Sequence, residues 1–330
     1  MQNNVVRILT FLHLLQKHTD EKHPLTRKEL TELMEEKGFS LNRKTLYEYV
    51  KQLSDVGYPI VVKKSGDYGY YLINTPFSFA QAKLLVDAVQ TSRVLEKDTS
   101  VQLISNIASL MSQYESAQLK RKLYMSERPK TFNKNIYDLI DKIHGAIQDN
   151  RQLSFRYFDW TLNHRNEKEK CYRHDGKEYI VSPYSLVWAE DSYYMVAHYP
   201  EYEGLSNFRV DRMDLLVVLK SKRVSLSLAT NQVDFNLAKY SQRLFSMFVG
   251  KVNEVVLLVD EDLLSVMIDR FSNHATYTRK NNKIEVKVSI EVSPPFLAWV
   301  FQFKNKVKIL APDSLQKMFV EHVESVLKQY

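Results

Sequence analysis

The first 75 residues show the apolar spacing of a helix three times, followed by two short apolar runs. Apolar residues three and four positions apart share one face of a helix, so the pattern predicts three amphipathic helices. Residues 60–62 and 70–73 flank the turn signal Ser65-Gly66-Asp67, which predicts a hairpin. The predicted inner faces are Val5, Ile8, Leu9, Leu12 and Leu15 in the first helix, Leu30, Leu33 and Met34 in the second, and Leu46, Val50 and Leu53 in the third.

Capping signals predict where the second and third helices begin and end. Thr26 and Glu29 have the spacing of a capping box, in which each side chain bonds the backbone N–H of the other residue. Gly38 and Gly57 are placed to end the two helices. A tight turn at residues 39–42 separates them. Helix, helix, tight turn, helix and hairpin is the order of a winged helix-turn-helix.

Polar and basic residues stand where such a domain contacts DNA. Recognition helices present their N-terminal side chains to base edges in the major groove. Lysines on the hairpin are suited to phosphate contact, and the N–H groups that begin the second helix can face a phosphate. The candidate DNA-binding residues are Thr26, Arg27 and Lys28, then Asn42, Arg43, Lys44, Thr45, Tyr47 and Lys51, and finally Lys63 and Lys64.

Two other interpretations of this segment stay open: a winged helix that binds protein, and a small helical domain with solvated charges. The net charge of residues 1–75 is small, so bulk charge does not decide between them. We favour DNA binding because of the positions of the charges.

Residues 76–134 are predicted to form a helical linker, because residues 79–95 and 101–114 carry helical apolar spacing. Residues 120–134 are strongly basic, so they form either a solvated connector or a segment that follows a DNA backbone. Helical spacing resumes in residues 136–147. We expect that helix to pack on its own domain rather than across a dimer.

From Leu153 the apolar period changes to two, which is typical of half-buried strands. Several short strands separated by turns predict a small β-barrel or sandwich. The polar residues 163–177 are predicted to be an exposed loop. The predicted strands are residues 153–157, 179–188, 193–199 and 207–213.

The C-terminal segment, residues 250–330, has the predicted order βαββαβα, which suggests a ferredoxin-like sheet with an added helix. We find no pattern of site chemistry in it. The predicted strands are residues 252–259, 277–279, 284–292 and 307–310, and the predicted helices are residues 261–271, residues 296–303 and the segment after Pro312.

Composition narrows the class of protein. The 330 residues are 44% hydrophobic and 26% charged, as in ordinary folded proteins, and the length predicts two or three domains. The net charge of +7 mildly favours a polyanionic partner. No apolar run approaches the roughly 20 residues that a membrane helix needs. The N-terminus is typical of a helix rather than a signal peptide, so we expect a cytoplasmic protein.

Scarce residues exclude several chemistries. The chain has 8 glycines and none of the glycine motifs that hold phosphates or position a nucleophilic serine. The single cysteine, Cys171, excludes an intramolecular disulfide and a multi-cysteine zinc site. His164 and His174 are near it in sequence, but cysteine catalysis needs an oriented spatial group. A metal site at Cys171, His174 and Asp175 is similarly weak, so we expect no enzyme activity, metal or cofactor.

The predicted strands between residues 179 and 213 resemble the core of a WYL domain. The family's naming tripeptide, Trp-Tyr-Leu, is here Tyr193-Tyr194-Met195, which keeps the middle residue. The third helix also departs from the family, with Glu48-Tyr49 where Arg-Asp is frequent. The matching segments are Ser182-Pro183-Tyr184, Leu186-Val187-Trp188, Val196-Ala197 and Phe208-Arg209-Val210-Asp211-Arg212.

The resemblance implies an Sm-like, SH3-type β-barrel behind a winged helix, as in many bacterial transcription regulators. It also implies a basic, aromatic-lined pocket for nucleotides or short single strands. Arginine forks suit phosphate, and aromatic faces stack on bases. Trp188, Phe155 and Tyr157 are expected in the core instead, and Arg209 and Asp211 could simply pair. The candidate ligand-binding residues are Ser182, Tyr184, Tyr194, His198, Phe208, Arg209 and Arg212.

We therefore expect an α+β multidomain protein: a winged helix-turn-helix (1–75), a helical linker (76–134), a WYL ligand-sensing domain (135–225) and a ferredoxin-like C-terminal extension (250–330). The expected function is a homodimeric transcription regulator that binds a double-stranded DNA operator and senses a nucleotide or short oligonucleotide. A second hypothesis is a nucleotide- or RNA-binding accessory protein whose winged helix contacts protein, and a third is an enzyme acting on nucleotides.

Overall fold

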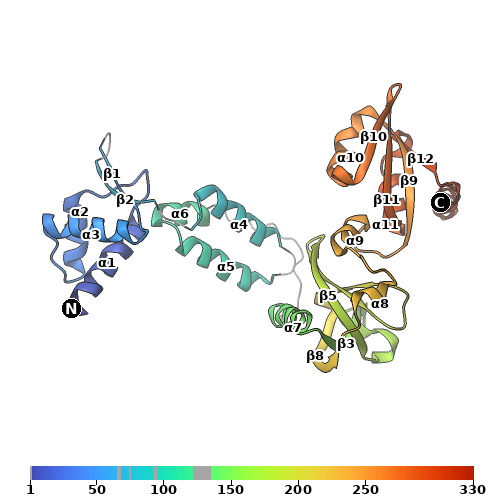
Figure 1. Cartoon of the computed structure of the whole chain (residues 1–330), viewed down its shortest axis with the longest axis horizontal. Helices are drawn as coiled ribbons and strands as arrows, with labels where there is room; N and C mark the ends of the chain where they lie inside the picture. The colour runs from blue at the N-terminus through green and yellow to red at the C-terminus, as the bar shows by residue number, and fades with distance from the viewer. Residues whose placement is uncertain (1, 65–67, 74–75, 93–94, 122–134) are drawn as a thin grey trace. The chain divides into compact units, whose positions relative to one another are not determined.

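The computed structural model in Figure 1 describes the chain except residues 1, 65–67, 74–75, 93–94 and 122–134, and except the side chains of residues 2, 3, 120 and 121. The chain forms two compact units, Met1–Phe132 and Asn133–Tyr330. The boundary between the units falls close to the predicted boundary at residue 134. The finer division into four domains stays a prediction.

The first unit begins with the predicted order of three helices and a hairpin. These are α1 (Gln2–His18), α2 (Arg27–Glu36), α3 (Arg43–Asp55), β1 (Ile60–Lys63) and β2 (Gly69–Leu72). The strands pair in antiparallel register from Ile60 opposite Leu72 to Lys63 opposite Gly69. The predicted hairpin turn at residues 65–67 lies outside the described residues.

The predicted capping signals are present. The Thr26 hydroxyl accepts a hydrogen bond from the Glu29 N–H at 3.3 Å, and the Glu29 carboxylate accepts one from the Thr26 N–H at 2.7 Å. Gly38 and Gly57 adopt φ values of +81° and +95°, the left-handed region that glycine enters without steric cost. The helix boundaries here therefore follow from local chemistry.

The predicted inner face of α1 is partly wrong. Val5 and Leu9 are each 57% exposed, whereas Phe11 and Leu14 are buried. Apolar residues cover much of this helix, so spacing alone permits more than one inner face. The ring of Phe11 packs 5.7 Å from that of Tyr49 on α3, and this contact between helices selects the face that is buried.

Three further helices complete the first unit: α4 (Phe79–Thr91), α5 (Lys97–Ser109) and α6 (Gln113–Arg121). They share a small core of Ala82, Val86, Ile104, Met111 and Leu119. The predicted helix 101–114 is wrong at its end, because α5 stops at Ser109 and α6 begins at Gln113. The Ser112 hydroxyl accepts the Glu115 N–H at 3.2 Å and so caps α6. Most of the predicted basic stretch 120–134 lies outside the described residues.

The second unit begins with α7 (Ile136–Gln148), followed by a six-stranded antiparallel sheet. The strand order is β4-β3-β5-β6-β7, and β8 also pairs with β3. α7 contacts β3, β5 and β8, which confirms that it packs on its own domain. The strands are β3 (Arg151–Leu162), β4 (Lys168–Tyr172), β5 (Tyr179–Ala189), β6 (Ser192–His198), β7 (Ser206–Arg209) and β8 (Met213–Lys222).

The structure corrects the predicted strands in three places. Residues 163–177, predicted as a loop, contain β4, which pairs with the second half of β3. The predicted strand 207–213 ends at Arg209 and continues as a 3-10 turn, Val210–Arg212. β8 was not predicted, because Leu215, Val217 and Val218 are exposed and its burial does not alternate. Only pairing with β3 makes it a strand.

Two short helices, α8 (Leu226–Thr230) and α9 (Leu237–Arg243), follow the sheet. They lie in a segment for which the sequence predicted no element. Tyr240 and Leu244 pack with Tyr184 and Tyr194 of the sheet in one buried cluster. This segment therefore covers part of the curled sheet.

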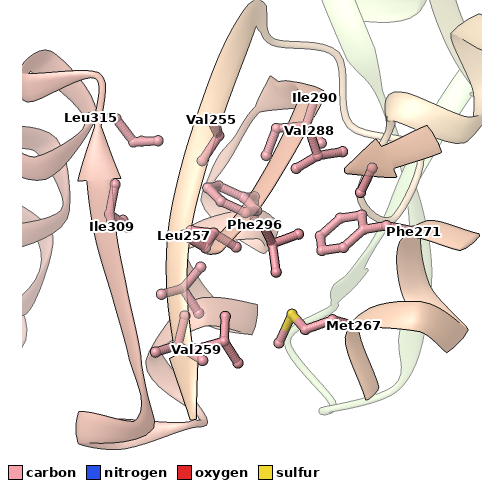
Figure 2. Close-up of a cluster of buried hydrophobic side chains, with 14 of the residues drawn as sticks. Val255, Leu257, Val259, Met267, Phe271, Val288, Ile290, Phe296, Ile309 and Leu315 are labelled. Atoms are coloured by element: carbon pink, nitrogen blue, oxygen red, sulfur yellow. The ribbon is translucent and has the colours of Figure 1, made fainter. Parts of the chain in front are cut away.

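The C-terminal segment has the predicted order βαββαβα, and its four strands form an antiparallel sheet in the order β10-β11-β9-β12. Val255, Leu257 and Val259 of β9 face Met267, Phe271 and Phe296, as Figure 2 shows. The elements are β9 (Lys251–Asp260), α10 (Leu264–Phe271), β10 (Ala275–Lys280), β11 (Lys283–Val292), α11 (Pro294–Phe301), β12 (Val307–Ala311) and α12 (Asp313–Leu327). Across the described residues, every helix is too short or too polar to traverse a lipid bilayer.

Candidate functional site

The start of α3 presents several of the predicted DNA-binding side chains. Arg43, Lys44 and Lys51 are exposed, while Leu46, Tyr49 and Leu53 on the opposite face are buried and hold the helix in place. Asn42 is the N-cap, and its Oδ1 accepts the Thr45 N–H at 2.9 Å. Asn42 therefore positions the helix, whereas the exposed basic residues are available to a partner.

Arg43 and Tyr47 form a pair on the exposed face of α3. The Arg43 Nε donates to the Tyr47 hydroxyl at 3.2 Å, and the guanidinium carbon lies 5.5 Å from the centre of the Tyr47 ring. Tyr47 is 47% exposed. The hydrogen bond from Arg43 lowers the pKa of the Tyr47 hydroxyl. Arg43 lies one helical turn before Tyr47, and the interaction between them fixes the direction of the Arg43 side chain.

The pair extends to the hairpin, which the sequence reasoning missed. Tyr47 and Tyr68 act electrostatically on the hydroxyl of Tyr70 on β2, and desolvation, the largest cause, raises the pKa of Tyr70 to about 12. Arg27 of α2 also acts electrostatically on Tyr47. Arg27, Arg43, Tyr47, Tyr68 and Tyr70 thus form one cluster, which we call the α3 cluster. In the sequence, the signal that could have indicated this cluster was the pair of tyrosines at alternate positions, Tyr68 and Tyr70.

Some of the remaining predicted DNA-binding residues are exposed, and others are already engaged in hydrogen bonds within the protein. Arg27, Lys28 and Lys64 are exposed. Thr26 is engaged with Glu29, whose carboxylate stands at the start of α2 and makes that site less suited to a phosphate. Lys63 is half-buried, and its Nζ donates to the Glu21 carbonyl at 3.1 Å. Of the two hairpin lysines, Lys64 is therefore the more exposed.

Four of the predicted ligand residues are integral to the curled sheet. Ser182 is 1% exposed, and its hydroxyl accepts the Val224 N–H at 3.0 Å. The Tyr184 hydroxyl donates to the Val224 carbonyl at 3.0 Å, and desolvation raises the pKa of Tyr184 to about 12. Phe208 packs edge-on against Phe155, with ring centres 5.3 Å apart, and Tyr194 is also buried. Their observed contacts are those of core residues.

His198 differs from these core residues. It is half-buried, and its Nδ1 is buried with no hydrogen-bond partner among the described residues. The Arg156 Nε is likewise buried with no hydrogen-bond partner among the described residues. Buried polar atoms are usually satisfied in folded proteins, so both atoms have capacity for a further partner.

Both predicted arginines form ion pairs. Arg209 donates from Nε and Nη2 to the two Asp211 carboxylate oxygens at 3.0 and 2.9 Å. Arg212 pairs with Asp159, which also accepts from the Arg173 Nε at 2.6 Å. Hydrogen bonding from Arg173 is the largest of the effects that lower the pKa of Asp159. Asp159 thus joins Arg173 and Arg212, which are far apart in sequence.

These two groups of ion pairs lie beside Tyr157, and we call them together the arginine cluster; its members are Arg173, Arg209, Arg212, Asp159 and Asp211. The hydroxyl of Tyr157 accepts the Arg209 backbone N–H at 3.0 Å and links the cluster to the core. The sequence identified Arg209 and Arg212, and noted that Arg209 could pair with Asp211. It missed Asp159 and Arg173, because only the pairing of β3 with β4 brings them together. Three guanidinium groups face two carboxylates, which leaves a positive excess.

Cys171 and His174, which the sequence analysis considered as a catalytic group, do not take part in the arginine cluster. Cys171 is exposed on β4. His174 Nε2 lies 3.2 Å from the Tyr202 hydroxyl. Neither residue is joined to the arginine cluster by a hydrogen bond among the described residues.

Comparison with known proteins gives one family match and 16 similar chains among the solved structures, of which two are described below. No curated protein matches the chain. The proteasome accessory factor B/C (PafBC) of Arthrobacter aurescens is 18% identical, with a TM-score of 0.30, over 98% of this chain and 49% of its own. This chain thus spans about half the length of that protein. A CRISPR Cas-related protein is 13% identical, with a TM-score of 0.37, over 99% of this chain and 86% of its own.

The family match covers the part of the chain that holds the arginine cluster. The model of the WYL domain matches residues 138–218, from α7 to β8. The family model matches nearly all of the residues that form the curled sheet. The segments around Ser182 and Arg209, which resemble this family in sequence, lie within them. Residues 138–218 of this chain are therefore a WYL domain.

Proposed function

We propose that this protein is a DNA-binding transcription regulator whose WYL domain senses a nucleotide or a short oligonucleotide. In this proposal, residues 1–75 are a winged helix-turn-helix, α4–α6 are a linker, the curled sheet is an Sm/SH3-like barrel, and the C-terminal sheet is a ferredoxin-like extension. The protein acts by binding rather than by catalysis, in the cytoplasm, where it meets its operator.

The observation that carries the DNA-binding part is the exposed Arg43, held by Tyr47 at the start of α3. The Nη groups of Arg43 have no hydrogen-bond partner in the described part of the chain, while its Nε is occupied. An arginine fork at the N-terminal end of a recognition helix is suited to the O6 and N7 atoms of guanine. The buried face of α3 supplies the rigid support that such a contact needs.

The arginine cluster supports the sensing part. A phosphate would be attracted by its positive excess, and bidentate guanidinium contacts suit phosphate geometry. A ligand that binds one conformer of a homodimer better than another shifts the population of conformers. The relative placement of the two DNA-binding domains would change with it. A two-fold dimer requires an operator with two half-sites about one turn of DNA apart, or a multiple of that spacing.

The test of DNA binding is a fluorescence-anisotropy titration with duplex DNA from upstream of the protein's own gene and with random duplex DNA. Arg43→Ala should weaken specific binding by about 1–3 kcal/mol and leave random binding nearly unchanged. Arg165→Ala, which removes an exposed arginine of the WYL domain, is the matched control. If wild-type protein shows no preference for the upstream DNA, the accessory-protein hypothesis is favoured instead.

A further inference from the structure

A cleft of about 430 Å³ lies in the second unit, between α9, the end of α10 and β11, which are labelled in Figure 1. Its volume falls in the range of small-molecule sites in proteins. The residues that line it are Lys239, Ser241, Gln242 and Arg243 from α9, Arg270, Phe271, Ser272 and His274 from the end of α10, and Val288 and Ser289 from β11.

The charges of this cleft are of one sign. Among the described residues, Lys239, Arg243 and Arg270 line it together with His274, and no Asp or Glu does. Within the described residues, none of these four side chains belongs to an ion pair. In the arginine cluster, by contrast, each guanidinium faces a carboxylate.

Arg270 is the most constrained of the four. Its Nη2 donates to the Leu244 carbonyl at 2.9 Å, and its guanidinium carbon lies 3.9 Å from the centre of the Phe245 ring. These neighbours desolvate the guanidinium and lower the pKa of Arg270. A desolvated cation without a carboxylate partner is costly, and a bound anion would relieve that cost.

Two carboxylates that act electrostatically on the arginines of the cleft are engaged elsewhere. Glu190 attracts Arg270 from a distance, but its carboxylate accepts the Ser246 hydroxyl at 2.6 Å. Glu291 attracts Arg243, but it is buried and accepts the Gly250 N–H at 3.0 Å. Desolvation raises the pKa of Glu291. Neither residue lines the cleft, so neither supplies a counter-charge inside it.

We propose that this cleft binds the phosphate group of a small phosphorylated ligand. Lys239, Arg243 and Arg270 supply the positive charge, and the hydroxyls of Ser241, Ser272 and Ser289 are additional donors. Of the two rings in the lining, Phe271 is buried in the core, so the imidazole of His274 is the exposed ring that a base could meet. The cations and hydroxyls recognise the phosphate. This site is made of residues other than those of the arginine cluster and does not depend on the proposed DNA binding.

The test is isothermal titration calorimetry of the full chain with inorganic pyrophosphate and with adenosine monophosphate. Lys239→Gln and Arg243→Gln should each weaken pyrophosphate binding by about tenfold, because each removes a charge-assisted contact. Lys308→Gln, at an exposed position of β12, should not weaken it. Melting temperatures measured in parallel show whether each variant is folded, and Arg270→Lys keeps the charge if Arg270→Gln does not fold.

Two outcomes overturn the proposal. One is the absence of pyrophosphate binding at millimolar concentration in the wild-type chain. The other is binding that Lys239→Gln and Arg243→Gln leave intact while Arg212→Gln removes it, since the phosphate would then bind the arginine cluster. Binding of both probes supports a nucleotide as the ligand, and binding of pyrophosphate alone supports another phosphate ester.

Discussion

The imidazole of His23 stacks on the ring of Tyr114, with ring centres 3.8 Å apart and planes inclined by 11°. His23 follows α1, and Tyr114 is in the first turn of α6, so the contact joins two segments that the sequence assigns to different domains. Asp20 reinforces it, because its carboxylate accepts from the Ser112 hydroxyl at 2.6 Å and lies 2.7 Å from the His23 Nδ1. The start of α6 is therefore fastened to the segment that follows α1.

Ser112→Ala should destabilise the first unit by about 1–3 kcal/mol, because it removes one of the donors to the largely buried Asp20 carboxylate and the cap of α6. Chemical denaturation followed by circular dichroism measures this loss. Ser105→Ala, on an exposed part of α5, is the matched control and should change stability little. Equal effects of the two substitutions would show that the Asp20 contact contributes nothing.

The contribution of Asp20 should depend on pH. Desolvation acts to raise the pKa of Asp20, but hydrogen bonds from Ser112 and His23 outweigh it and hold the pKa below the ordinary value of 3.8. A carboxyl with a lowered pKa in the folded state stabilises the protein above its unfolded pKa, and this stabilisation is lost as pH falls through the folded pKa. The stability difference between wild type and Asp20→Asn should therefore be constant near neutral pH and shrink below 3.8.

Denaturation midpoints of wild type and Asp20→Asn, measured at a series of pH values, check this expectation. The comparison removes the contribution of carboxyl groups that do not interact with Asp20, and the remaining difference includes Glu115, whose pKa Asp20 helps to raise. A difference that is the same at every pH would contradict the hydrogen-bonded, ionised Asp20 that the structure shows.

Lys64→Ala should lower the slope of log binding constant against log salt concentration by about 1, because each lysine that contacts a phosphate releases about one counterion. Lys63→Ala should lower it less, since the Lys63 Nζ is bound to the Glu21 carbonyl. DNA-binding titrations at several salt concentrations measure both slopes. If both slopes equal that of wild type, the hairpin does not contact the DNA backbone.

Asp211→Asn should increase the affinity of the WYL domain for a short single-stranded oligonucleotide by a few-fold. The substitution frees the Arg209 fork from its bidentate partner and adds one positive charge to the arginine cluster. Arg209→Gln should have the opposite effect. Anisotropy with a labelled oligothymidylate measures both, and Asp234→Asn, at an exposed position after α8, is the matched control. Unchanged affinity in both variants would remove Arg209 from the ligand site.

Much of the fold could be predicted because it rests on contacts within a few residues. The capping box of Thr26 and Glu29, the left-handed Gly38 and Gly57, and the βαββαβα order of the C-terminal segment all follow from local spacing. The match to the WYL family likewise rests on short runs of residues such as Ser182-Pro183-Tyr184. Each of these signals is complete within one or two elements.

The candidate sites depended on tertiary structure, because their partners come from distant elements. The buried face of α1 is selected by Tyr49, β8 exists through its pairing with β3, and Arg212 meets Asp159 and Arg173 only when the sheet curls. The unpaired cations between α9 and α10 have no sequence motif at all. Local spacing determined which elements form and which residues are basic. The packing of those elements decided which charges are neutralised and which remain open to a ligand, because electrostatic pairing depends on distance in space and not along the chain.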